Sequence, residues 1–267
     1  MSDVARTADP VLYEVREPGI ALLTLNRPER LNAWNGALAD HYFASIDRAV
    51  ADPAVRVIVV TGAGKGYCAG ADMSDLQGLG GGLEAAVGQR ILSEMMSVPK
   101  PMIGAINGAA AGMGLAQALL CDIRFAATTA KFTTSFGQRG LIAEWGLSWL
   151  LPRVVGTARA MDLLLSGRVV LGDEAAAMGL VNAAVEPERL LEHTLAYAAG
   201  LATNVSPTSM AVMKRQVYDD WSKDFATAHE DSMRLMVASL GRPDFREGVR
   251  SYVQKRPPAF PPVDPTA

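Results

Sequence analysis

Short apolar runs alternate with helical periodicities along the first two hundred residues of the 267-residue chain. Residues 11–26 predict two strands around a turn at Pro18-Gly19. Residues 32–51 repeat apolar side chains every three to four positions, which predicts a helix. The run at 55–61 (VRVIVVT) is short, β-branched and continuously apolar, which predicts a strand buried on both faces.

A second cycle of the same kind follows. Residues 101–106 predict a strand, residues 107–114 a glycine-rich turn, and residues 115–120 one or two helical turns. Two more short strands are predicted at 123–125 and 131–134. The repeated order of strand, glycine-rich turn and helix predicts an α/β fold built from stacked β-β-α units.

Toward the C-terminus the pattern becomes purely helical. Helices are predicted at 189–203, at 225–240 and in a last segment that ends near residue 254. Another begins at Ser206-Pro207, because serine is a preferred helix cap and proline a preferred first helical residue.

These patterns divide the chain into three parts. We expect a flexible N-terminus at 1–10, a core at 11–200 and a C-terminal helical region at 201–267 that is too small to form a core alone. Methionines of that region recur at helical spacing, which favours packing in the core or at a subunit interface over a ligand role. They are Met210, Met213, Met233 and Met236. A run of glycines at 77–82 (QGLGGG) predicts a mobile loop.

Composition and charge exclude several classes of function. The net charge of −3 provides no basic surface for nucleic acid. Cys68 and Cys121 are too far apart for a CxxC motif, so we expect reduced, buried thiols, and the three histidines lack metal-ligand spacing. The polar N-terminus has no signal-peptide pattern, and we expect a cytoplasmic protein. The apolar stretch at 101–120 is interrupted by glycines and by Asn107, which argues against a membrane span.

Glycine-rich segments follow two of the predicted strands, at 62–72 and 107–114. The first is not a phosphate-binding loop of the GxxxxGK[ST] kind, because Lys65 is followed by glycine. A dinucleotide-binding fingerprint would need its third glycine at position 67, where the chain has Tyr67. An oxidoreductase therefore remains only as an alternative from another functional class. Two helix-starting turns that face one point would form an oxyanion hole from their unpaired N–H groups. The pattern alone leaves open whether the glycines do this or only make tight corners.

Five segments stand in a characteristic order along the chain. They are NRPERLNA at 26–33, GYCAGADM at 66–73, INGAAAGMG at 106–114, LPRVVG at 151–156 and KRPPAF at 255–260. Together they resemble the signature of the crotonase (enoyl-CoA hydratase/isomerase) superfamily over about residues 11–260. The resemblance implies a spiral of β-β-α units with a C-terminal helical region and assembly into trimers or dimers of trimers. It also implies an enzyme that acts on an acyl-coenzyme A thioester through a stabilised enolate, with no cofactor beyond the coenzyme A of the substrate.

By this resemblance, the backbone N–H groups of Ala71 and Met113 hold the thioester oxygen. Methionine replaces the more usual glycine at 113, which keeps the backbone donor and narrows the pocket. The expected coenzyme A contacts are Arg27, Arg30, Leu31, Ala33, Ala69 and Asp72, with Phe260 reaching the adenine from a neighbouring subunit. The two arginines are candidates for phosphate contacts, with simple solvated charge as the alternative.

The acid–base residues depart from the hydratase pattern. Enoyl-CoA hydratases of this superfamily use two glutamates to activate water and supply a proton, and those positions align with Ala116 and Phe136. Between Glu94 and Glu144 the only acid is Asp122, which we interpret as structural. A hydratase of the two-glutamate kind is therefore disfavoured.

Glu144 stands where some relatives carry their catalytic acid. It predicts a one-carboxylate, isomerase-type proton shift, because such a reaction adds no water. Its apolar neighbours indicate a pocket, with a surface loop as the alternative. Trp145, where the family often has a small residue, is expected to line the acyl pocket together with Ala116 and Phe136 and to shorten or redirect it. The alternatives are hydratase or hydrolase activity, and an acyl-CoA binding protein without catalysis.

Overall fold

The computed structural model describes residues 9–72 and 88–264. The strands are β1 (Val11–Arg16), β2 (Ile20–Leu25), β3 (Val57–Gly62), β4 (Gly66–Cys68), β5 (Met102–Ile106), β6 (Ala109–Ala111), β7 (Ile123–Ala127), β8 (Lys131–Thr133), β9 (Val170–Leu171) and β10 (Ala183–Val185). The α-helices are α1 (Gly36–Ala51), α4 (Met113–Leu119), α5 (Leu147–Val155), α6 (Thr157–Ser166), α7 (Gly172–Ala177), α8 (Leu190–Asn204), α9 (Pro207–Asp220), α10 (Phe225–Leu240) and α11 (Pro243–Gln254). Short 3-10 helices are η1 (Pro28–Arg30), η3 (Leu92–Ser97), η4 (Gly137–Arg139) and η5 (Pro187–Arg189). The glycine run at 77–82 and residues 1–8 lie outside the described residues.

The strands form two sheets. One has six strands in the order β1-β2-β3-β5-β7-β10, and the other has four in the order β4-β6-β8-β9. Only β1–β2 in the first and β8–β9 in the second pair antiparallel. From β3 to β8 consecutive strands alternate between the sheets, so that β3, β5 and β7 lie in the large sheet and β4, β6 and β8 in the small one. The chain thus winds as a spiral of β-β-α units, as predicted.

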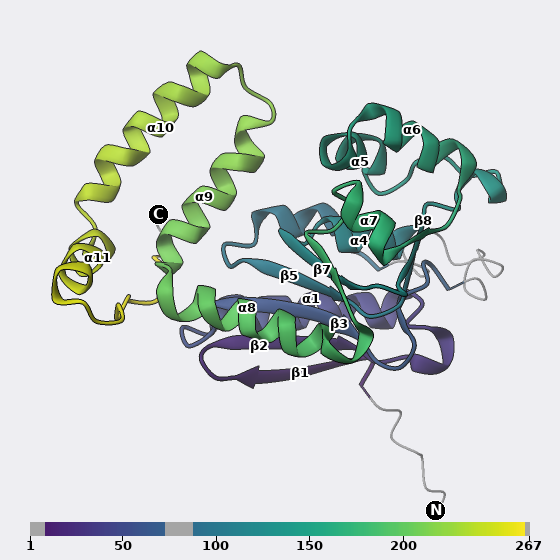
Figure 1. Ribbon diagram of the computed structural model, residues 1–267, viewed down its shortest axis with the longest axis horizontal. Helices are drawn as coiled ribbons and strands as arrows, with labels where there is room; N and C mark the ends of the chain where they lie inside the picture. Colours follow the sequence, from purple (N-terminus) through teal and green to yellow (C-terminus); the bar gives the residue numbers. More distant parts are fainter. Residues whose placement is uncertain (1–8, 73–87, 265–267) are drawn as a thin grey trace, which may run out of the picture.

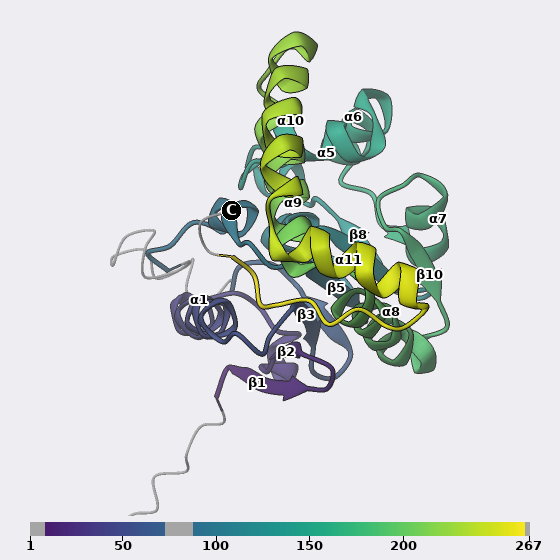
Figure 2. The same ribbon diagram turned by 90° about the vertical axis from the view of Figure 1, so that its left-hand side faces the viewer.

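The core follows from the apolar runs. All four residues from Val57 to Val60 of β3 are 0% exposed, as predicted for a strand covered on both faces. Each such side chain contributes about 1.5–3 kcal/mol through burial. Helix α8 packs on β2, β3, β5 and β7, while α1 packs on β1 and β2. Figure 2 shows α1 and α8 on opposite sides of these strands.

The last helices leave this core. Helices α9 and α10 form an arm that extends away from the sheets, and α11 lies at its base (Figure 1). Met210 is buried at the root of α9, but Met213, Met233 and Met236 are 45–51% exposed. No residue of α10 is buried, so its apolar side chains are left uncovered by the described part of the chain.

Several predicted boundaries are wrong. The helix predicted at 32–51 begins only at Gly36, because Asn35 caps it by accepting the Leu38 N–H at 3.0 Å. Trp34 instead forms a bridge to a distant segment. Helix α8 (Leu190–Asn204) continues through residue 200, the expected boundary between the core and the C-terminal helical region.

Short elements inside the glycine-rich segments were not predicted. Strands β4 and β6 have three residues each and lack apolar alternation. They form because each finds a parallel partner in the small sheet. The helices α5, α6 and α7 were also missed, and α5 contains Pro152, which argues against a helix on local grounds.

Candidate active site

The fold brings the two glycine-rich segments side by side. Strand β4 pairs in parallel with β6, so both segments leave the small sheet at the same edge. Beyond the strands they are in close contact. A methyl group on Gly114 would lie 2.0 Å from the carbonyl oxygen of Cys68, and one on Gly70 would lie 3.0 Å from that of Ala111. Glycine is therefore required here for close approach as well as for tight corners.

Ala71 presents the first unpaired N–H group. It forms an isolated parallel bridge with Trp34, in which the Trp34 N–H donates to the Gly70 carbonyl at 2.7 Å and the Asp72 N–H donates to the Trp34 carbonyl at 2.8 Å. In a parallel bridge of this kind, the N–H of the central residue points away from its partner. None of the residues that the structure describes accepts a backbone hydrogen bond from Ala71.

Met113 presents the second. It is the first residue of α4, where a helical N–H has no partner within the helix. The preceding Gly112 has φ 51° and ψ −116°, a conformation that residues with a Cβ rarely adopt. This turn directs the Met113 N–H out of the start of the helix. Two free N–H groups at neighbouring turns are the arrangement that stabilises negative charge on a carbonyl oxygen.

The expected coenzyme A segment is bound to the first turn. Ala69 donates its N–H to the Leu31 carbonyl at 3.1 Å, and Ala33 is buried beside it. Leu31 is 42% exposed and has φ 49°. Asn32, which is not among the predicted site residues, is fully buried and donates to the carbonyls of Ala63 (3.0 Å) and Gly66 (2.8 Å). Its φ of 57° is a backbone conformation that asparagine tolerates better than most residues, so the asparagine itself is the signal that the sequence offered.

The two predicted phosphate-binding arginines differ in their surroundings. Arg27 pairs with buried Asp72 at 2.8 Å and donates to the Ala33 carbonyl, so its guanidinium holds the turn together. Asp72 is thus an ion-pair partner, and whether a helix follows it lies outside the described residues. The Arg30 side chain is exposed.

Glu144 lies on the loop at 137–146 that leads from Phe136 to α5. Phe136 is 6% exposed, and its ring lies 3.5 Å from the position of a methyl group on Gly112, beside the second donor. Helix α5 packs on α4, whose first residue is Met113. The loop is therefore anchored beside Gly112 at one end and, through α5, to α4 at the other.

The backbone of this loop is strained at one residue. Gly140 and Gly146 have positive φ, which glycine adopts freely, but Trp145 has φ 56°, an unfavourable backbone for a bulky side chain. Trp145 is partly buried and packs against the core, which holds it in place. Glu144 is also partly buried, and no described residue donates a hydrogen bond to its carboxylate. Of the apolar neighbours that indicated a pocket, Leu141 and Ile142 are 43% and 77% exposed in the single chain.

Ala116 and Phe136, which the resemblance aligns with the two glutamates of hydratases, are both buried. Asp122, the only acid between Glu94 and Glu144, has several hydrogen-bond partners. Its carboxylate accepts the Met102 N–H at 2.7 Å and the Tyr218 hydroxyl at 3.0 Å, and it pairs with Lys214 at 2.9 Å. It connects α9 to the core, in agreement with a structural role.

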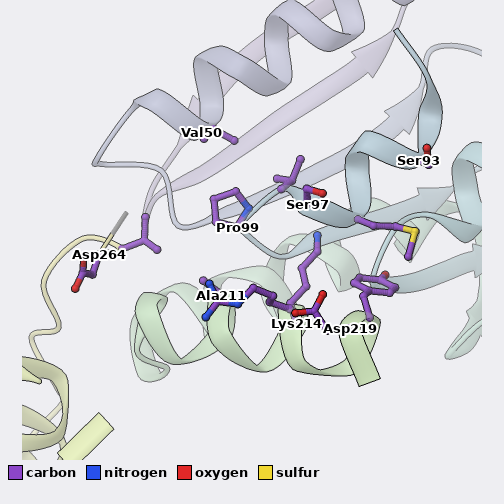
Figure 3. Close-up of a pocket in the computed structure, with 13 residues that line it drawn as sticks. Val50, Ser93, Ser97, Pro99, Ala211, Lys214, Asp219 and Asp264 are labelled. Atoms are coloured by element: carbon purple, nitrogen blue, oxygen red, sulfur yellow. The ribbon is translucent and has the colours of Figure 1, made fainter. Parts of the chain in front are cut away.

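Phe260 is separate from the other predicted residues. Its ring contacts the position of Gly248 in α11, and its carbonyl accepts a hydrogen bond from Arg56 at 2.8 Å. A cavity of about 640 Å³ between η3 and α9 also lies apart (Figure 3). It is lined by residues such as Ser97, Pro99 and Lys214 and contains none of the predicted site residues.

No cluster of three or more histidine, cysteine, aspartate or glutamate side chains suited to a metal ion occurs in residues 9–72 and 88–264. Within the same ranges, no helix is long and apolar enough to cross a membrane.

The similarity to known proteins covers nearly the whole chain. Residues 15–262 match the enoyl-CoA hydratase/isomerase family model. A probable enoyl-CoA hydratase of Rhodobacter capsulatus is 38% identical over 253 residues, which cover 94% of this chain and 97% of the relative. The 1,2-epoxyphenylacetyl-CoA isomerase of Escherichia coli is 36% identical over 252 residues, which cover 91% and 95%.

Solved structures agree with these relatives. A probable enoyl-CoA hydratase/isomerase from Mycobacterium abscessus superimposes with a TM-score of 0.85 at 33% identity, covering 94% of this chain and 98% of that one. An enoyl-CoA hydratase from Mycobacterium marinum has 50% identity and a TM-score of 0.70, covering 80% and 100%. The chain belongs to the enoyl-CoA hydratase/isomerase family of the crotonase superfamily, whose enzymes act on acyl-CoA thioesters.

Proposed function

We propose that this protein is an enoyl-CoA isomerase in which Glu144 alone moves the proton. One observation carries the proposal. Asp122 and Glu144 are the only acids between residues 95 and 161, and Asp122 is held by Met102, Lys214 and Tyr218. Glu144 is the carboxylate left for chemistry beside the second glycine-rich turn.

The reaction needs only one carboxylate and two donors. The thioester oxygen accepts hydrogen bonds from the N–H groups of Ala71 and Met113. Glu144 removes a proton from C2 of a 3-enoyl-CoA, and the electron pair of that C–H bond forms the enolate. The protonated Glu144 then donates to C4, and the double bond moves from C3–C4 to C2–C3. Each N–H donor contributes about 3–4 kcal/mol to the transition state, because charge develops on the oxygen only there.

Hydratase activity is the second candidate, since several relatives are named probable enoyl-CoA hydratases. The residues Ala116 and Phe136 argue against hydratase activity, because they are buried and apolar at the positions where the water-activating glutamates would be. The relative named 1,2-epoxyphenylacetyl-CoA isomerase supports the isomerase class.

The binding of the coenzyme A moiety follows from the surroundings of the first turn. Leu31, Ala33 and Ala69 would line the pantetheine path, exposed Arg30 would meet phosphate, and Arg27 with Asp72 would keep the turn in shape. In a trimer or dimer of trimers, Phe260 would contact the adenine of the coenzyme A that is bound to a neighbouring subunit. No cofactor beyond the substrate's coenzyme A is needed, and a cytoplasmic location is consistent with this chemistry.

The test compares Glu144→Gln with Glu188→Gln, a control at an exposed glutamate of η5. Conversion of a 3-enoyl-CoA to the conjugated 2-enoyl-CoA is followed by absorbance, with EDTA present throughout. We expect Glu144→Gln to lower kcat at least about a hundredfold, the size of a general acid–base contribution, and the control to keep the native rate.

A second measurement separates the alternatives. In D2O, the native protein should exchange the C2 protons of the acyl-CoA, and Glu144→Gln should not. Rapid hydration of crotonyl-CoA by the native protein would favour the hydratase. Binding without exchange or turnover would show a protein without catalysis, and an active Glu144→Gln variant would return this residue to the surface-loop alternative.

A further inference from the structure

A buried chain of hydrogen bonds joins β4, which leads to Ala71, and α4, which begins at Met113, to helix α1. Tyr67 of β4, Gln117 of α4 and Tyr42 of α1 are each 0% exposed. The Tyr67 hydroxyl donates to Oε1 of Gln117 at 2.5 Å, and Nε2 of Gln117 donates to the Tyr42 hydroxyl at 2.7 Å. The Tyr42 hydroxyl in turn donates to the sulfur of Met95 at 3.3 Å. We call Tyr42, Gln117 and Tyr67 the buried triad.

The donor and acceptor roles of the triad side chains agree along the whole chain of hydrogen bonds. Each hydroxyl has a single proton to donate, and the amide offers its oxygen to one tyrosine and its nitrogen to the other. Burial raises the pKa of both tyrosines well above the usual 10, so they remain neutral donors. A network that is satisfied in this way holds its elements in one relative position.

Gln117 connects the triad to the second donor. It stands four residues after Met113 in α4, on the same face of the helix. Its amide therefore fixes how far the start of α4 lies from β4, where the two elements have almost no spare room between Gly114 and Cys68.

Tyr42 connects the triad to the first donor. Its ring meets the fully buried Trp34 edge-on, with ring centroids 5.2 Å apart. Trp34 is the residue whose N–H and carbonyl bind the residues on either side of Ala71. Tyr67 reaches the same segment along the chain, four residues before Ala71.

We propose that Gln117, through Tyr42 and Tyr67, is a positioning residue that sets the relative placement of the Ala71 and Met113 N–H groups and so the strength of the oxyanion hole. This inference rests on the proposed function, since it assumes that these two groups receive the thioester oxygen. The triad touches no substrate. Its effect on catalysis acts entirely through the two backbone donors.

The experiment measures polarisation of the bound thioester. An acyl-CoA with a ¹³C-labelled carbonyl is bound to the full chain, and the C=O stretching frequency is read from isotope-edited infrared difference spectra. Two well-placed donors lower this frequency relative to the free thioester. Gln117→Leu removes the amide at similar volume, and Tyr67→Phe removes one hydroxyl and keeps the ring.

We expect both variants to lose most of the frequency lowering and to reduce kcat by about 10- to 100-fold, because a displacement of up to 1 Å at such a site has effects of that size. KM should stay near the native value, since the coenzyme A contacts are on other residues. The control is Thr194→Val in α8, which removes an equally buried hydroxyl hydrogen bond, 2.8 Å to the Leu190 carbonyl, away from the site. It should keep the frequency and kcat at native values despite its loss of stability.

The outcomes are distinguishable. If the native protein lowers the C=O stretching frequency and both Gln117→Leu and Tyr67→Phe lower it equally, the positioning role is overturned. The proposed function would then remain intact. Should Gln117→Leu fail to fold, Tyr67→Phe decides alone. No lowering in the native protein would overturn the oxyanion hole itself, and the positioning role with it.

Discussion

The close contact between α4 and β4 makes Gly114→Ala a sharp test of how the site is built. The new methyl group would lie 2.0 Å from the Cys68 carbonyl oxygen, whereas carbon–oxygen contacts normally begin at about 3.3 Å. The backbone fixes the position of both the methyl carbon and the carbonyl oxygen, so no side-chain rotation can relieve the overlap. Helix α4 must move away from β4 by about 1 Å.

Two free-energy terms oppose each other in this variant. Alanine in a helix is favoured over glycine by about 1 kcal/mol. Overpacking costs about 1–3 kcal/mol, and the upper end applies because backbone meets backbone. We expect a net loss of stability of about 2 kcal/mol. The activity loss should be larger, about a hundredfold in kcat, because the shift separates the Met113 N–H from that of Ala71.

Thermal unfolding measures the change in stability. The change in kcat is measured from isomerisation of a 3-enoyl-CoA, assayed well below the unfolding midpoint. Gly200→Ala is the matched control. Gly200 lies within α8 with open space where the methyl group would be, so this change should raise stability by up to about 1 kcal/mol and leave kcat unchanged. A Gly114→Ala variant with native stability and native kcat would refute the argument that this contact sets the geometry of the donors.

Further predictions concern stability and assembly. Lys100 is buried and donates to the carbonyls of Ala49 and Asp52 at the end of α1. Burial lowers the pKa of Lys100 from 10.5 to about 8, although the nearby Asp52 carboxylate acts to raise it. Between pH 8 and 10 the unfolded chain therefore binds more protons at this residue than the folded chain does. The free energy of unfolding of the native protein should then rise with pH, relative to that of Lys100→Met, by up to about 1.4 kcal/mol per pH unit. Urea unfolding of both proteins at several pH values measures this, and a pH-independent difference would contradict it. The exposed methionines of α10 should be covered in an oligomer, so light scattering at micromolar concentration should report three or six copies, and a stable monomer would count against assembly through the arm.

The agreement between predicted and observed elements is best where local signals are strong. The helix predicted at 225–240 matches α10, and Ser206 caps α9 as its sequence indicated. Caps, prolines and apolar periodicity act within a few residues, so they are readable from the chain alone. Strands β4 and β6 carried no such signal, because their stability comes from partners some forty residues away.

The candidate site divides in the same way. The sequence by itself determined the family, and it predicted Glu144 as the acid and apolar residues at 116 and 136, because these depend only on which residue stands where in a motif. Tertiary structure alone decided that Arg27 pairs with Asp72, that Asn32 ties the first turn together, and that a buried amide links α4 to β4 and α1. Those partners lie tens of residues apart, and their contacts depend on how strands register and helices pack. Packing is a property of the whole fold, and no local pattern of residues encodes it.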